Sequence, residues 1–171
     1  MPVTLRPVPA ARPDRPGTAT TLELPATWST VDAPAPALAA FSDGRTLSPA
    51  IETNIVLTAA DPVPGGTLAS WQAAVREERL ATLPDLQILE DRSVPGTGGE
   101  ELWHTSSVLT DPQGATLLVR SWSLVREGTG LTLTLTTLPL VDAEHGAELD
   151  RIAATWAPGP PSRERTPDAD S

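Results

Sequence analysis

The sequence predicts an α+β fold, in which an antiparallel β-meander packs with two α-helices. Four segments rich in β-branched and apolar residues, between residues 86 and 138, are separated by turn-forming residues. Two further segments, near residues 68–83 and 142–156, carry apolar residues at helical spacing. The chain has 171 residues, which is enough for one domain with one hydrophobic core.

The first half of the chain supplies short strands and one helix. Residues 61–66 form a Pro/Gly-rich breaker, and Thr67 is a suitable N-cap for the helix that follows. Pro84 predicts the end of this helix, because the residue before a proline disfavours helical dihedrals. Strands are expected before the breaker at Thr21–Leu24 and Ile51–Thr58, and between them lie two further segments, Trp28–Val31 and Leu38–Phe41.

The second half of the chain forms the meander and the last helix. Residues 111–114 (Asp-Pro-Gln-Gly) match a type I turn and predict that residue 110 pairs with residue 115. Residues 127–130 predict a second hairpin that pairs residue 126 with residue 131. Asp142 is the expected cap of the last helix, whose apolar stripe ends at Trp156. The expected strands are Leu86–Val94, Glu100–Thr110, Ala115–Arg126 and Leu131–Leu138.

This pairing predicts two different sheet faces. One face carries Trp103 opposite Trp122 and Leu135, and we expect both helices to pack on it or around its rim through Trp71 and Trp156. The reverse face has a polar row and an apolar end. The polar row is His104, Ser121 and Thr136, and the apolar end is Val108, Leu117, Val119 and Leu138.

Composition excludes several classes of protein. A net charge of −10 disfavours binding to nucleic acid and to anionic membranes. Cysteine is absent, which excludes disulfides and thiolate metal sites, and no run of residues is long and apolar enough to span a membrane. Residues 1–20 and 158–171 are predicted to be disordered tails around one domain at residues 21–157. The absence of an apolar leader segment predicts a cytoplasmic location.

No arrangement of residues predicts catalysis. His104 with Ser106 or Ser121 suggests a Ser–His pair, but an open sheet face offers no oxyanion donors. Acidic residues and His145 near the start of the last helix could suggest a metal site, although carboxylates are also favoured there by the helix dipole. We therefore expect no enzyme activity, no cofactor and no metal.

Short apolar motifs suggest a family. They are residues 24–28 (Leu-Pro-Ala-Thr-Trp), 54–57 (Asn-Ile-Val-Leu), 68–71 (Leu-Ala-Ser-Trp), 96–99 (Gly-Thr-Gly-Gly) and 152–156 (Ile-Ala-Ala-Thr-Trp). Over about residues 20–157 the chain resembles actinobacterial LpqN-type proteins and, more broadly, the PsbP-like α/β/α sandwich group. The resemblance implies a non-enzymatic role, because relatives include a photosystem accessory subunit, a nuclear-transport cofactor and Eag-type chaperones. It supplies no catalytic residues.

Three functions follow as hypotheses. The first is a binding, adaptor or chaperone-like module that holds a protein partner on the reverse sheet face, whose simpler interpretation is an ordinary solvated face. The second is a small-molecule binder or hydrolase that uses His104 with Ser121 and Thr136. The third is a structural subunit of a larger assembly.

Overall fold

The computed structural model describes residues 5–10, 18–33, 36–47, 51–60, 63 and 66–159. Within them the chain forms two helices and two antiparallel sheets. The elements are β1 (Leu5–Ala10), β2 (Thr20–Pro25), β3 (Ser29–Val31), β4 (Ala37–Leu47), β5 (Ile51–Ala60), α1 (Leu68–Thr82), β6 (Gln87–Pro95), β7 (Glu101–Thr110), β8 (Thr116–Arg126), β9 (Thr129–Thr137), α2 (Pro139–Ala154) and β10 (Ala157–Pro158).

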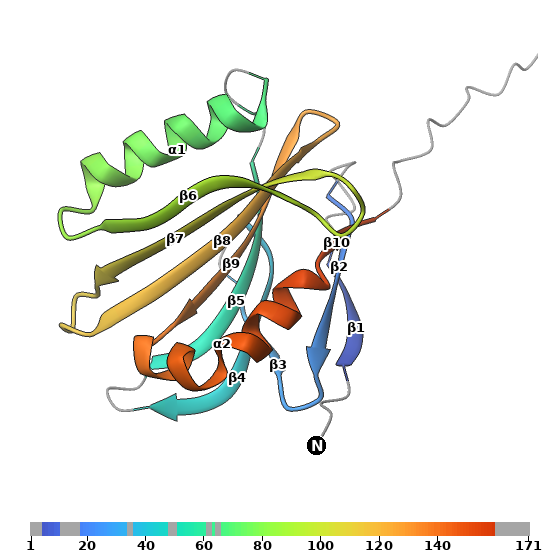
Figure 1. The fold of residues 1–171 in the computed structure, drawn as a ribbon. Coiled ribbons are helices and arrows are strands. Elements are labelled where there is room, and N and C mark those ends of the chain that lie inside the picture. Colours follow the sequence, from blue (N-terminus) through green and yellow to red (C-terminus); the bar gives the residue numbers. More distant parts are fainter. Residues whose placement is uncertain are drawn as a thin grey trace, which may run out of the picture.

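The large sheet has seven strands in the order β3-β4-β5-β9-β8-β7-β6, and the small sheet has the order β1-β2-β10. Helices α1 and α2 lie on opposite sides of the large sheet, and the small sheet lies beside α2 (Figure 1). The prediction that both helices pack on one face is therefore wrong. The helices and antiparallel strands confirm the predicted α+β class.

The hydrophobic core lies on the α2 side of the large sheet. Helix α2 contributes Leu149 and Ile152, and Trp156 follows just after its end. The small sheet contributes the fully buried Leu22 and Leu24. The floor is a row of buried aliphatic and aromatic residues from the central strands: Phe41, Ile55, Leu57, Leu131, Leu133 and Leu135. Burial of this apolar area is the main stabilising term of the fold.

Helix α1 begins and ends where its sequence predicts. The Thr67 hydroxyl accepts a hydrogen bond from the Ser70 amide over 3.2 Å, and the Ser70 hydroxyl accepts one from the Thr67 amide, which completes a capping box. The helix ends at Thr82, two residues before Pro84.

Helix α2 begins earlier than predicted. Its N-cap is Leu138, without a side-chain cap, and Pro139 occupies the first turn, where its missing N–H has no cost. Asp142 lies inside the first turn, so its prediction as the cap is wrong. Within the described residues, neither helix is long and apolar enough to cross a membrane.

The hairpin registers differ from the predicted ones. Gly114 has a φ of 88°, and Thr110 pairs with Thr116, because one extra residue follows the type I turn. In the second hairpin Glu127 and Gly128 both have positive φ, 49° and 79°, so they alone form a two-residue type I′ turn. Residue 126 consequently pairs with 129.

The one-residue shift of the first hairpin changes the contents of both faces, whereas the two-residue shift of the second keeps each side chain on its face. Trp103 pairs with Ser123, and Trp122 pairs with His104 and with Leu133. The predicted row of Trp103, Trp122 and Leu135 is therefore wrong, because Trp103 lies on the opposite face from the other two.

Strand β1 lies inside the segment predicted to be an N-terminal tail. Its residues pair with β2 along their whole length, from Leu5 with Pro25 to Ala10 with Thr20, so the tail prediction is wrong for residues 5–10. Pro7 and Pro9 are two residues apart, so the N–H groups that they lack belong to the same edge of β1. Prolines are tolerated in β1 because it is an edge strand, with a partner strand on one side only. Residues 1–4, 11–17 and 160–171 of the predicted tails lie outside the described residues.

Candidate functional site

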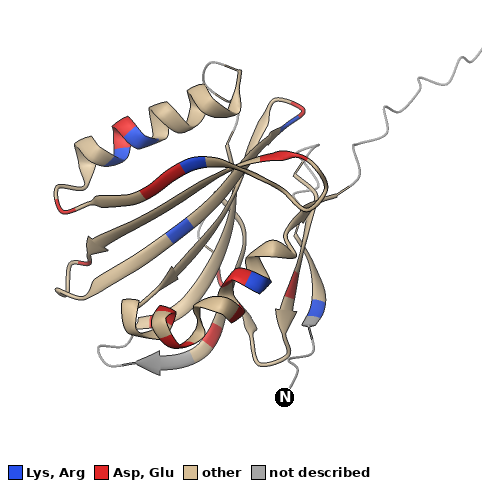
Figure 2. Ribbon diagram, in the orientation of Figure 1, with Lys and Arg blue, Asp and Glu red and all other residues tan. Residues whose placement is uncertain are grey.

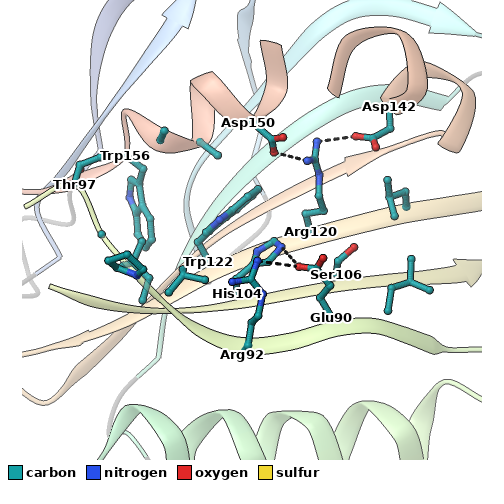
Figure 3. Close-up of a pocket in the computed structure, with 18 residues that line it drawn as sticks. Glu90, Arg92, Thr97, His104, Ser106, Arg120, Trp122, Asp142, Asp150 and Trp156 are labelled. Atoms are coloured by element: carbon teal, nitrogen blue, oxygen red, sulfur yellow. Dashed lines mark hydrogen bonds and ion pairs between the residues drawn. The ribbon is translucent and has the colours of Figure 1, made fainter. Parts of the chain in front are cut away.

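A cavity of about 630 Å³ lies between α2 and strands β6, β7 and β8, and we call it the α2 cleft (Figure 3). Its apolar part lies around the two rings of Trp122 and Trp156. Its polar part lies further along the strands, around Arg120 and His104. The apolar lining includes Val94, Leu102, Leu118 and Ala153, and the polar lining includes Glu90, Arg92, Asp142 and Asp150.

Arg120 connects the sheet to α2. Its guanidinium is ion-paired with Asp142, with 2.7 Å between Nη2 and Oδ1, and with Asp150 through Nη1 (Figure 3). The Arg120 side chain is 10% exposed, whereas Asp150 is 59% exposed, so solvent screens the second pair strongly. The guanidinium carbon also lies 5.9 Å from the centre of the Trp122 ring, within the range of a cation–π contact.

Two buried N–H groups of the cleft lining have no acceptor among the described residues. They are Nε of Arg120 and Nε1 of Trp156. A buried donor without a partner costs about 1–3 kcal/mol, so native structures usually satisfy such groups with protein, water or ligand. The acceptors of the cleft lining, such as Asp142 and Asp150, therefore leave these two donors unsatisfied.

His104 lies in the polar part of the cleft, where its ring contacts Trp122 of the apolar part. Its Nδ1–H donates to the carbonyl oxygen of Ser121 over 3.1 Å, and its Nε2 lies 3.5 Å from Oε2 of Glu90. Its ring is stacked obliquely on Trp122, with 4.9 Å between ring centres. Burial lowers the pKa of His104 from its ordinary value, and the bond to Ser121 and the charge of Glu90 oppose this effect only in part. The ring is therefore neutral at pH 7.

The cleft contains no recognisable catalytic arrangement among the described residues. The nitrogens of His104 contact a carbonyl oxygen and a carboxylate, and neither contacts a serine hydroxyl. The carboxylates of Asp142 and Asp150 are both ion-paired with Arg120. No group of three or more His, Asp or Glu side chains in the described part of the chain could hold a metal ion.

The residues that the sequence placed on one reverse face are divided between two faces. Only His104 lines the α2 cleft, and Val108 lies on the same face of β7 further along the strand. Ser121, Thr136, Leu117 and Val119 lie on the face covered by α1. Leu138 has left the sheet and is the N-cap of α2. The grouping was wrong because the first register is shifted by one residue, which exchanges the faces of β7 relative to β8, whereas the second is shifted by two, which keeps them.

Sequence reasoning missed the central residue of the cleft. Arg120 lies in the otherwise apolar and small-polar run of β8 and alternates onto the face of Trp122. A charged side chain on a predicted core face was the available signal. Its partners, Asp142 and Asp150, were interpreted only as features of the last helix, because nothing in the sequence relates that helix to β8. Figure 2 shows charged positions concentrated on the two helices, on β6 and near strand ends, with little charge along β5 and β9.

Comparison with solved structures identifies the fold. The cyanobacterial PsbP (CyanoP) of Synechocystis sp. PCC 6803 is 14% identical, with 93% of this chain and 95% of that chain covered and a TM-score of 0.66. LpqN of Mycobacterium tuberculosis, involved in cell envelope biogenesis, is 16% identical, with 91% and 92% covered and a TM-score of 0.63. The Ran-binding protein Mog1p of Saccharomyces cerevisiae is 13% identical, with 91% and 96% covered and a TM-score of 0.58.

The chain thus has the PsbP-like α+β fold that its sequence motifs suggested. No family model matches the sequence, and no curated protein matches it either. At these identities the likeness concerns the fold, and function has to be argued from the site.

Proposed function

We propose that the protein is a non-enzymatic binding module and that a segment of a partner protein occupies the α2 cleft. The observation that carries this proposal is the pair of buried donors without acceptors, Nε of Arg120 and Nε1 of Trp156. A peptide backbone offers a carbonyl oxygen at every residue, so a bound segment that displaces the side chains enclosing these two nitrogens can supply both acceptors.

The other features of the cleft support the same type of occupant. The rings of Trp122 and Trp156 border its apolar part, where an apolar side chain can be buried, and aromatic residues often anchor protein interfaces. Leu89, which also lines the cleft, is 58% exposed and extends the apolar surface toward solvent. A volume of about 630 Å³ suits a few side chains, so the bound segment is short.

The comparisons support this proposal at the level of the fold. Mog1p is named a Ran-binding protein, so a chain with this fold can present a surface to another protein. Adaptor and chaperone-like roles both require a partner segment to be held in this way. An LpqN-type assignment is part of the same proposal and is supported by the shared fold.

The proposal is tested by selecting random displayed peptides against the protein and mapping the bound peptides by NMR. The chain has five tryptophans, whose indole N–H groups give separate resonances. We expect the Trp156 indole resonance to move strongly when its N–H gains an acceptor. We expect those of Trp71 and Trp103, on the other face, to stay in place.

A matched pair of variants on one helix completes the test. Ala154 is exposed and lines the cleft, whereas Ala147 is exposed on the same helix away from it. Ala154→Leu should fill the cleft and weaken peptide binding at least about tenfold, and Ala147→Leu should leave it unchanged. The proposal would be overturned if no peptide is selected. It would also be overturned if peptides bind without moving the Trp156 indole resonance and without responding to Ala154→Leu.

A further inference from the structure

A second cavity lies on the opposite side of the large sheet, beneath α1. Its volume is about 500 Å³, and its floor is formed by strands β5, β6, β7, β8 and β9. Helix α1 contacts the sheet in its first turn through Trp71. Along the described length of the helix, the buried residues are Trp71 and Gln72. The sheet separates this cavity from the α2 cleft, so the two can be tested independently.

The floor of the α1 cavity is rich in hydroxyl groups. Thr105 pairs with Ser121, which pairs with Thr134, and these hydroxyl side chains face α1 across three neighbouring strands. Within the described residues, the hydroxyls of Ser121, Thr134 and Thr58 make no hydrogen bond. A hydroxyl both donates and accepts, so this floor suits a ligand with polar groups of both kinds.

The roof of the α1 cavity carries a cation without a carboxylate partner. The Arg79 guanidinium donates to the Ser107 hydroxyl over 3.0 Å and is ion-paired with no acidic side chain of the described residues. The neighbouring Arg76, by contrast, is paired with Asp91 at 3.1 Å. Burial lowers the pKa of Arg79 and Asp91 opposes this, but a guanidinium remains charged.

Gln72 adds an amide to the same roof. Its side chain is 6% exposed, it lines the α1 cavity, and it makes no hydrogen bond to any described residue. The amide atoms are not among the fully enclosed polar atoms without a partner, so a ligand or water in the α1 cavity can reach them. Trp71 closes one end of the cavity with an apolar ring.

We infer that the α1 cavity binds a small organic monoanion, whose carboxylate contacts Arg79 and whose hydroxyl-bearing body lies on Ser121 and Thr134. Arg and carboxylate match in charge and geometry, and the pair strengthens when it is shielded from water. Glu78 lines the same cavity and Asp91 lies nearby, so these carboxylates would repel a second negative charge that does not contact Arg79.

The inference is tested by NMR titration with two probes that share a hydroxylated ring, D-glucuronate and D-glucose. At millimolar concentration we expect glucuronate to shift the backbone amides of Ser121 and Thr134 and the side-chain Nε–H of Arg79. Glucose should bind about 10–100-fold more weakly, which is the effect expected for a lost charge-assisted hydrogen bond.

Two matched pairs of variants assign the binding to the α1 cavity. Arg79→Gln should remove the preference for glucuronate, whereas Arg92→Gln, on the other face of β6, should keep it. Thr134→Val should weaken binding, and Thr136→Val, on the same strand but outside the lining, should not. Equal binding of the two probes, shifts confined to the α2 cleft, or no shifts at all, as for a cavity that holds only water, would overturn the inference.

Discussion

Trp71 of α1 lies directly over Gly130 of β9, and its ring leaves no room at position 130 for a residue with a β-carbon. A β-carbon built on Gly130 would lie 2.5, 2.7 and 2.8 Å from three carbons of the Trp71 ring. Trp71 is 6% exposed, while most of α1 faces solvent. This contact is therefore the principal apolar attachment of α1 to the sheet, and it holds the roof of the α1 cavity.

Gly130→Ala should destabilise the protein by about 1–3 kcal/mol, because an overpacked contact forces side chains or backbone to shift. The measurement is urea-induced unfolding followed by circular dichroism. Gly146→Ala is the contrasting control. Gly146 is inside α2, and the atoms nearest to a β-carbon there belong to the Asp142 side chain at 3.4–3.5 Å, an ordinary contact distance. Alanine should therefore stabilise the helix by about 0.5–1 kcal/mol. Equal effects from the two variants would contradict the close contact.

Glu127→Asn should stabilise the β8–β9 hairpin. Glu127 has a φ of 49°, in the left-handed region where asparagine is tolerated better than glutamate, and Asn-Gly is the preferred type I′ pair. We expect a gain of about 0.5–1 kcal/mol in the free energy of unfolding. Gly128→Ala, at a φ of 79°, should have the opposite sign. A loss of stability in Glu127→Asn would argue against the two-residue turn.

The same turns show what could be predicted from the sequence and what could not. Residue type located most strands of the large sheet and the start of α1 at Thr67, because these follow from local backbone preferences, but it missed β1. It did not locate the registers, because Asp111–Gly114 fits a type I turn with or without one following bulge residue. Because side chains alternate along a strand, the one bulge residue shifts the register by one and places His104 on the opposite face of the sheet from Ser121.

The α2 cleft was beyond sequence reasoning for a different reason. Arg120 and Asp150 are separated by 30 residues and are brought together only by the packing of α2 on β8. Trp156 was expected in the core, where it lies, but the absence of an acceptor for its N–H depends on every neighbour of the ring. Such absences are properties of tertiary structure and have no local signature.

Arg120→Met should lower the free energy of unfolding by about 1–3 kcal/mol. The substitution removes the cation between Asp142 and Asp150 and leaves two carboxylates close together. We expect less than the full cost of breaking a buried pair, because Asp150 is 59% exposed. Arg151→Gln, an exposed position near the end of α2, should change stability little. Unfolding in urea distinguishes the two variants.

A triple variant separates charge from packing. If repulsion between the two carboxylates causes the loss, then Arg120→Met combined with Asp142→Asn and Asp150→Asn should recover most of it. If the lost contact of the guanidinium with Trp122 dominates, the triple variant should be as unstable as Arg120→Met alone.

His104 should make stability depend on pH near neutrality. Because burial lowers its pKa in the folded protein, the unfolded chain takes up the proton first as the pH falls. The unfolded state thus binds more protons between the folded-state pKa and about 6.5, the ordinary value of histidine. In that window the free energy of unfolding rises with pH. The stabilisation by neutral His104 is complete above it and is lost as the pH falls through it.

The measurement is urea unfolding of His104→Asn and of the unsubstituted protein between about pH 7.5 and pH 5. Asparagine cannot be protonated, so the difference in stability between the two proteins should shrink as the pH falls. The chain has only one other histidine, His145, which is 39% exposed on α2. A difference between His104→Asn and the unsubstituted protein that stays constant with pH would mean that His104 titrates alike in both states. Burial in the α2 cleft would then not determine its protonation.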